Sequence, residues 1–204
     1  MRTLLAVEWK RRPSGLILSV AALVLVLLAA GAHSASGHRK HGFGGLWPHT
    51  PGEHLHLPYA MGGRGLTSGY VDVINRAMLA WYQTRTWVWP YHATSGNKLY
   101  FHVGRVNDTF FGYATNYEGE RECTGSGCRY TFSQLIINRS TLDAESRFTK
   151  QKVVAHEFGH ALGLSHPCSS GRCPRRVRTV MNQGILRYNV PQNHDVNDVN
   201  RMYP

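Results

Sequence analysis

Apolar residues recur along the chain at two periods, and each period predicts a different element. A period of three to four residues within residues 67–85, after the capping residue Ser68, predicts a helix. The same period predicts a second helix that begins at residues 146–149 and ends at Leu162. The apolar stripe of the first helix consists of Val71, Ile74, Met78, Trp81 and Tyr82. Such a stripe is typical of a helix that packs one face on a core.

Short runs rich in β-branched and aromatic residues, separated by turn residues, predict strands. Pro90 cannot donate a hydrogen bond to a neighbouring strand, so its run is expected at a sheet edge. The runs cover residues 55–60, 86–91, 99–104, 110–115 and 134–140, and a last short helix is expected over 195–203. This order of elements predicts an α+β or α/β sandwich, with irregular chain between Gly163 and the last helix.

The N-terminus has the pattern of a secretory leader. The basic residues 10–12 precede the apolar run 16–30, and Ala30-Gly31-Ala32 fits a small-residue cleavage site. We expect a signal peptide over 1–32. The alternative is an uncleaved membrane anchor formed by residues 16–32, with the following domain outside. Both readings place the rest of the chain outside the cytoplasm.

Residues 33–54 are rich in His, Gly and Pro and lack periodicity, which indicates a linker. The folded domain is then expected over 55–204. The whole chain has 204 residues, 42% hydrophobic and 17% charged, as is typical of a globular protein.

The formal net charge is +11, of which the leader carries +3 and the remainder +8. No zinc-finger, homeodomain or RNA-recognition pattern accompanies this charge, so no nucleic-acid partner is expected. The charge suits contact with an anionic cell surface or an ordinary solvated basic face. The sequence leaves the oligomeric state open, with a monomer as the expectation.

All four cysteines follow the leader, and an even number in an exported chain favours disulfides. They are Cys123, Cys128, Cys168 and Cys173. Equal spacing within each pair favours two local bridges, 123–128 and 168–173, over the other pairings. A zinc site built from all four cysteines is the competing interpretation, but this spacing is not a common zinc pattern.

The stretch HEFGHALGLSH, residues 156–166, carries the clearest chemistry. His156 and His160 are four residues apart, so a helix presents both imidazoles on one face, and Glu157 is placed beside them. Gly163 can adopt a positive φ that ends the helix and lets His166 return as a third ligand. Chance produces all five positions about once in ten thousand chains of this composition.

With these five residues, the chain resembles the metzincin zinc endopeptidases. Met181 in TVMNQG lies where that family has a methionine turn beneath the metal, and the closing HDVNDVNRMYP resembles the end of a matrixin catalytic domain. The resemblance implies a small, secreted, matrixin-like peptidase of the M10 type from a bacterium. It also implies the fold: a twisted mixed sheet with an active-site helix and a backing helix, then an irregular C-terminal subdomain with a final short helix.

The resemblance further implies one catalytic zinc ion bound by the three histidines, with Glu157 as the general base for a zinc-bound water. Protein or peptide substrates are expected along an edge strand containing Gly112, Tyr113 and Ala114. Arg175 and Arg176 would lie in the segment that walls the pocket for the residue after the cut.

Departures from the family limit the assignment. Gln183 replaces the tyrosine that follows the methionine in serralysins and astacins, and no cysteine precedes residue 123 to form a cysteine switch. A calcium requirement stays open. Two other functions remain compatible: a secreted, basic, zinc-containing binding protein at an anionic cell surface, and an amidase acting on cell-wall peptides. The presence of Glu157 argues against the first, because a retired active site usually loses its base.

Overall fold

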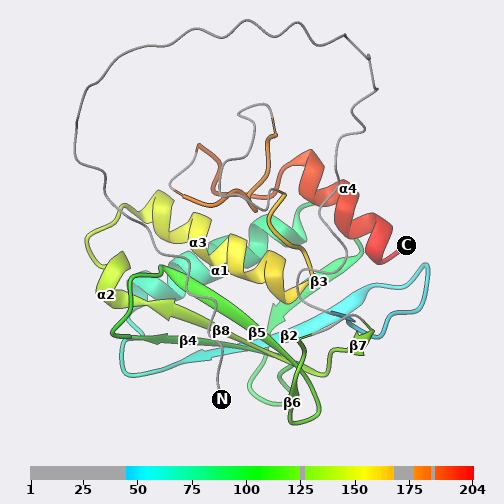
Figure 1. Cartoon of the computed structure of the whole chain (residues 1–204), viewed down its shortest axis with the longest axis horizontal. Helices are drawn as coiled ribbons and strands as arrows, with labels where there is room; N and C mark the ends of the chain where they lie inside the picture. The colour runs from blue at the N-terminus through cyan, green and yellow to red at the C-terminus, as the bar shows by residue number, and fades with distance from the viewer. Residues whose placement is uncertain (1–44, 125–126, 168–176, 185–186) are drawn as a thin grey trace, which may run out of the picture. The chain divides into compact units, whose positions relative to one another are not determined.

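The computed structural model describes residues 45–124, 127–167, 177–184 and 187–204, and their main feature is a six-stranded sheet (Figure 1). Its strands, in order across the sheet, are β3 (Val88–His92), β2 (Leu55–Gly62), β4 (Leu99–Gly104), β8 (Phe132–Asn138), β5 (Gly112–Glu118) and β6 (Arg121–Glu122). The first four are parallel to their neighbours, whereas β5 is antiparallel to both β8 and β6. The predicted α+β class with a mixed sheet is confirmed, and β3, which contains Pro90, is an edge strand as expected.

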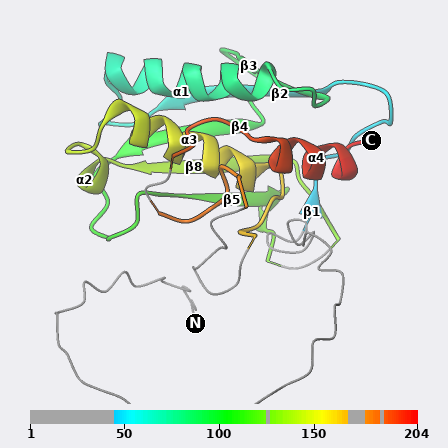
Figure 2. The same cartoon turned by 90° about the horizontal axis from the view of Figure 1, so that it is seen from above.

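Two helices lie side by side on one face of this sheet, namely α1 (Ser68–Tyr82) and α3 (Arg147–Ala161) (Figures 1 and 2). The Trp81 indole N–H of α1 donates to the Ala155 carbonyl of α3 at 3.0 Å. The Trp81 ring also packs edge-on against Phe158, with 5.7 Å between ring centroids. α1 therefore backs α3, which is buried along its whole second half.

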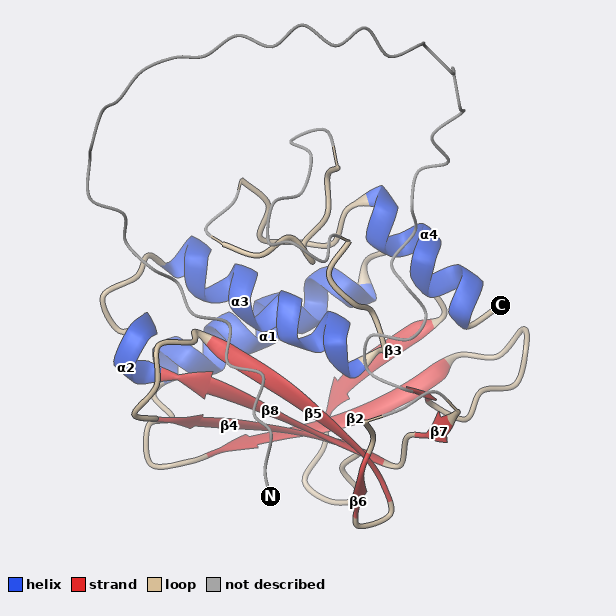
Figure 3. Cartoon of the chain, viewed as in Figure 1, coloured by secondary structure: helices blue, strands red, loops and turns tan. Residues whose placement is uncertain are grey.

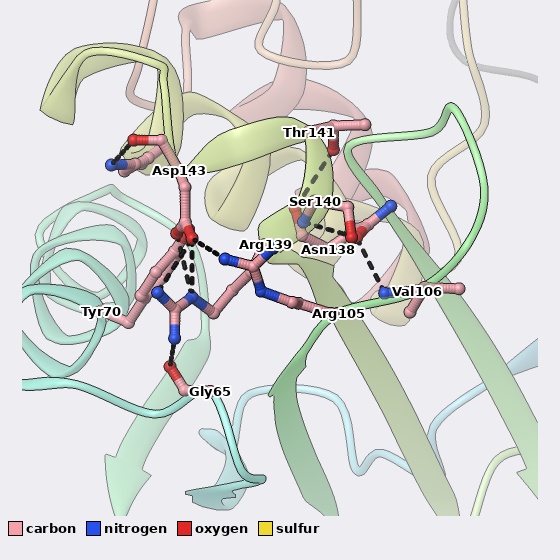
Figure 4. Close-up of polar contacts among 10 residues, drawn as sticks. Gly65, Tyr70, Arg105, Val106, Asn138, Arg139, Ser140, Thr141 and Asp143 are labelled. Atoms are coloured by element: carbon pink, nitrogen blue, oxygen red, sulfur yellow. Dashed lines mark hydrogen bonds and ion pairs between the residues drawn. The ribbon is translucent and has the colours of Figure 1, made fainter.

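The chain enters α3 through a short helix, α2 (Arg139–Leu142), directly after β8. The sequence predicted a strand through residue 140, but the strand ends at Asn138 because its side chain caps α2. Asn138 Oδ1 accepts hydrogen bonds from the Ser140 N–H at 2.9 Å and the Val106 N–H at 3.1 Å (Figure 4). A side-chain acceptor at this position satisfies a helix N–H that would otherwise lack a partner.

An ion pair then fixes the end of α2. The Arg139 guanidinium donates to the Asp143 carboxylate at 2.8 Å, and Asp143 also accepts from the Tyr70 hydroxyl of α1 at 3.0 Å (Figure 4). Because Asp143 precedes α3 by only a few residues, these contacts tie the start of α3 to the backing helix. α3 is thus placed against both the sheet and α1.

The opposite end of α3 is closed by segments from both ends of the described chain. β1 (Gly45–Leu46) pairs in parallel with β7 (Cys128–Arg129). The Trp47 indole, 3% exposed, donates to the Ala161 carbonyl at 2.8 Å. The Tyr203 hydroxyl, which follows α4 (Asn193–Met202), donates to the Leu162 carbonyl at 2.8 Å. Trp47 lies within the range 33–54 that the sequence indicated as a linker, yet it belongs to the core.

Figure 3 shows the helices on one side of the main sheet and the loops that follow α3 close to α4. The leader expected over 1–32 lies outside the described residues, as do residues 33–44. Among the helices that the structure describes, none has the length and apolar character needed to cross a membrane.

Candidate metal centre

The second half of α3 presents the first two predicted ligands. His156 and His160 are one helical turn apart and are 7% and 4% exposed. Beyond Ala161 the helix ends at Gly163, whose φ is +94°. The Leu164 N–H donates to the Gly159 carbonyl at 3.0 Å, a bond typical of a glycine-ended helix. A side chain at Gly163 would also crowd the Gly45 carbonyl oxygen, 2.9 Å from the position of a Cβ atom.

This turn brings His166 back to the helix. The Nε2 atom of His166 lies 3.0 Å from Nε2 of His156 and 3.1 Å from Nε2 of His160. The three histidines are therefore one cluster able to face a single ion. Tetrahedral zinc with Zn–N bonds of about 2.0–2.1 Å places its nitrogen ligands about 3.3–3.4 Å apart, close to the distances seen here.

Backbone carbonyls fix which ring nitrogens face the centre of the cluster. His156 Nδ1 donates to the Val180 carbonyl at 2.9 Å, and His160 Nδ1 donates to the Leu164 carbonyl at 2.7 Å. A carbonyl can only accept, so each Nδ1 carries the hydrogen and each Nε2 keeps its lone pair. Burial, with the nearby Lys152 cation, holds the pKa of His156 well below its usual value and favours the neutral ligand form. Converging lone pairs on neutral imidazoles fit a zinc ion.

Glu157 lies beside the cluster, between α3 and the strand β5. The side chain is 5% exposed. Burial raises the pKa of Glu157 to about 8, with the Lys152 cation acting in the opposite direction. A Cβ atom on Gly112 of β5 would come within 3.1 Å of Glu157 Cγ. The Glu157 side chain therefore packs against β5 only because residue 112 has no side chain.

Met181 lies in a tight, fully buried turn against the same helix. Its Sδ atom occupies the space that a Cβ atom on Gly159 would need. The turn is held by Asp195 of α4, whose carboxylate accepts from the Thr179 hydroxyl and from the Val180 N–H at 2.9 Å. Met181, predicted from the sequence, thus shares a turn with the carbonyl that orients His156.

Two residues of this arrangement were missed by the sequence reasoning. Asp195 also accepts from the Gln192 N–H at 2.8 Å in a capping box, and that pattern was visible at the start of the last helix. Lys152 is 5% exposed and its ammonium donates to the Asn182 carbonyl at 2.8 Å. A lysine one turn before His156 on the buried side of α3 was the available signal.

The predicted edge-strand residues lie in β5, where Gly112 packs against Glu157. β5 runs from Gly112 to Glu118 instead of over 110–115, and β6 pairs only with Tyr117 and Glu118. Among the described residues, the outer edge of β5 from Gly112 to Thr115 therefore has no strand partner, and the Asn116 carbonyl after it accepts from the Cys123 N–H at 2.8 Å. Tyr113 is 42% exposed on this strand, whereas Ala114 faces the core.

The cysteines and the pocket arginines are only partly placed. Cys123 and Cys128 are free thiols in the structure, and each places its sulfur within 4.8 Å of the other and of a Glu118 carboxylate oxygen. The 123–128 disulfide stays a prediction. Cys168, Cys173, Arg175 and Arg176 lie outside the described residues.

No protein-family model and no curated protein sequence matches the chain. Among solved structures it is similar to High choriolytic enzyme 1, a hatching-enzyme zinc protease from Oryzias latipes (medaka fish), with a TM-score of 0.40 and 21% identity over 59% of this chain and 50% of that one. It is also similar to myroilysin, with a TM-score of 0.42 and 16% identity over 59% of this chain and 52% of that one. The chain spans about half the length of both structures. Similarity at this level establishes neither family nor activity.

Proposed function

We propose that the chain is an exported zinc-dependent endopeptidase of the metzincin type. The observation that carries this proposal is the convergence of three histidine Nε2 atoms, with a buried glutamate directly after the first histidine and with the Nδ1–H groups of His156 and His160 fixed by carbonyls. His156, His160 and His166 would hold the zinc ion. When bound, zinc supplies Lewis acidity that lowers the pKa of water and polarises a peptide carbonyl.

The protein's own groups account for the remaining chemistry. Glu157, which directly follows His156 on α3, would accept a proton from the attacking water and return it to the leaving amine nitrogen. The Val180 and Leu164 carbonyls keep His156 and His160 in the ligating tautomer. The turn that contains Met181 holds the ring of His156 through the Val180 carbonyl.

An extended peptide segment is the substrate form that the unpaired edge of β5 can take. Main-chain groups of Gly112, Tyr113 and Ala114 would pair with it by adding a strand to the sheet. β5 begins at Gly112, which packs against the Glu157 side chain, so we expect a bound peptide to pass near the general base. Protein or peptide substrates follow from this arrangement.

Arg175 and Arg176 are proposed to influence which side chain is accepted after the cut, through attraction to acidic or polar groups. Charge reversal of both arginines should change the cleavage-site preference on a peptide library while leaving turnover of the best substrate similar. Identical cleavage-site preferences in the wild type and the charge-reversed variant would show that these arginines do not contribute to the specificity pocket.

The proposed leader, residues 1–32, is tested by sequencing the N-terminus of exported material.

The function is tested by comparing the purified chain with its Glu157→Ala variant. Casein, gelatin and purified cell wall serve as substrates, and bound zinc is quantified in both proteins. We expect about one zinc per chain in each, and cleavage of casein or gelatin by the wild type alone. Zinc-loaded wild type that releases peptides from cell wall alone would identify the amidase. Zinc binding without hydrolysis of any of the three would favour the binding protein, and absence of zinc binding would refute the metal centre.

A further inference from the structure

Lys152 is a buried cation close to the proposed metal centre. The side chain is 5% exposed, and its ammonium donates to the Asn182 carbonyl at 2.8 Å. Within the part of the chain that the structure describes, Lys152 forms no ion pair with a carboxylate at 4.0 Å or less. Burial of this charge is costly, and the Glu157 and Asp195 carboxylates offset the cost only in part, because they act from beyond ion-pair distance.

The hydrogen bond of Lys152 reaches the same turn that contacts His156. Lys152 and His156 are one turn apart on α3, so their side chains lie on the same face of the helix. Lys152 contacts the carbonyl after Met181, and His156 contacts the carbonyl before it, at 2.9 Å. Two side chains of α3 thus form hydrogen bonds to the turn, one on each side of Met181.

The third attachment of the turn comes from α4. Asp195 accepts from the Val180 N–H at 2.9 Å. Without Lys152, the Asn182 carbonyl would lose its bond to α3, and the carbonyl of Val180 would be held to α3 by His156 alone. The orientation of that carbonyl sets the orientation of the His156 ring.

We propose that Lys152 is a positioning residue of the zinc centre, which fixes the Asn182 carbonyl so that Val180 presents its carbonyl to His156. This inference rests on the proposed zinc site. Lys152 acts through the backbone of the turn and touches neither metal nor substrate. A hydrophobic side chain of similar length would fill the same volume at a lower cost of burial, so the amine is retained for its hydrogen bond.

The test compares Lys152→Met with Lys150→Met in the full chain. Lys150 is the matched control because it lies on the same helix and its ammonium also donates to a backbone carbonyl, that of Asp143 at 3.2 Å, at the end of α3 away from the histidines. Zinc affinity is measured by chelator competition. The visible absorption spectrum of the cobalt-substituted protein reports ligand geometry, and thermal unfolding is followed in the metal-free protein.

We expect Lys152→Met to bind zinc about tenfold more weakly, as is typical when an outer partner of a metal ligand is lost. Its cobalt spectrum should change, while the metal-free protein unfolds at the same or a higher temperature. Lys150→Met should match the wild type in zinc affinity and cobalt spectrum. If Lys152→Met does not fold, Lys152→Gln gives the same comparison, since its shorter amide cannot reach Asn182.

Unchanged zinc affinity and spectrum in Lys152→Met, with zinc bound normally by the wild type, would overturn the role of Lys152 and leave the proposed function intact. Tighter zinc binding by Lys152→Met would also overturn it, because repulsion between the ammonium and the metal would then outweigh positioning. Absence of zinc binding by the wild type would overturn both proposals.

Discussion

Gly159 and Met181 fit together only because residue 159 has no side chain. A Cβ atom at that position would overlap the Sδ atom of Met181, which is fully buried in the turn below α3. The glycine between His156 and His160 is therefore as constrained as the histidines are. The stretch with the proposed zinc ligands and the methionine turn pack together as one unit.

Substitution of Gly159 by alanine should weaken that unit. Overpacking destabilises the folded state by about 1–3 kcal/mol, whereas the better helix propensity of alanine stabilises it by about 1 kcal/mol. We therefore expect the free energy of unfolding to fall by about 1 kcal/mol. Zinc affinity should fall as well, because a displaced Met181 moves the Val180 carbonyl away from His156. Urea unfolding and chelator competition measure the two effects.

Gly69→Ala on α1 is the matched control for that substitution. At Gly69 the nearest atom to a new Cβ is the Thr67 hydroxyl oxygen at 3.8 Å, so alanine fits there. Gly69→Ala should leave stability equal or slightly higher. Equal effects of the two substitutions would show that Met181 adapts to residue 159 without cost.

Gly112→Ala should reduce turnover while zinc stays bound. A Cβ atom at residue 112 would lie 3.1 Å from Glu157 Cγ and 2.9 Å from the Ile136 carbonyl oxygen, so the strand and Glu157 must separate. A misplaced general base costs about tenfold or more in kcat. Peptide hydrolysis and zinc content are measured on the same preparation. Undiminished kcat would mean that Glu157 keeps its place through a different contact.

Asp195→Asn should lower both stability and zinc affinity. Asp195 is fully buried and its carboxylate accepts from Thr179, Val180 and Gln192, which joins α4 to the methionine turn. Hydrogen bonds to a charged group contribute about 1.5–3 kcal/mol, so we expect a loss of about 2–3 kcal/mol in the free energy of unfolding. Asp72→Asn removes an exposed carboxylate and serves as the control, with a much smaller change expected. Equal losses of unfolding free energy in Asp195→Asn and Asp72→Asn would show that Asp195 does not stabilise the methionine turn.

Lys152 should make the stability of the metal-free protein rise at alkaline pH. Burial lowers the pKa of Lys152 from 10.5 to about 8. Between those values the unfolded chain holds the proton and the folded chain has released it, so the free energy of unfolding increases with pH. Below pH 8 both states are protonated and the full cost of the buried charge remains. Relative to Lys152→Met, the wild type should gain about 3 kcal/mol between pH 8 and 10.5. A constant difference between the two proteins would show that the amine is hydrated when the protein is folded.

The histidine cluster was predictable because helical geometry and one glycine determine it. His156 and His160 follow from the period of the helix, and the return of His166 follows from the positive φ of Gly163. These constraints are local, because all the residues involved lie within the eleven-residue stretch HEFGHALGLSH. The edge position of the strand with Pro90 was likewise a local inference, from its missing N–H.

The supporting residues were not predictable because their partners are distant backbone groups. The amine of Lys152 bonds a carbonyl 30 residues later in the chain, and nothing in the sequence marks a carbonyl as an acceptor. Trp47 was assigned to a linker because the residues around it in the sequence are mostly Gly, His and Pro. In the structure its indole N–H donates a hydrogen bond to the Ala161 carbonyl. Asn138 ended a strand that its apolar neighbours would have extended, because its own side chain offered a cap.

The contacts made by residues 45–47 set a limit on how far the N-terminus can be trimmed. Removal of residues before Gly45 leaves the β1–β7 pairing and the Trp47 indole in place. A cut beyond Trp47 would uncover the Ala161 carbonyl and open the helix end from which His166 returns. We therefore expect trimmed forms of the protein to begin at or before Gly45, and forms that begin later should not accumulate.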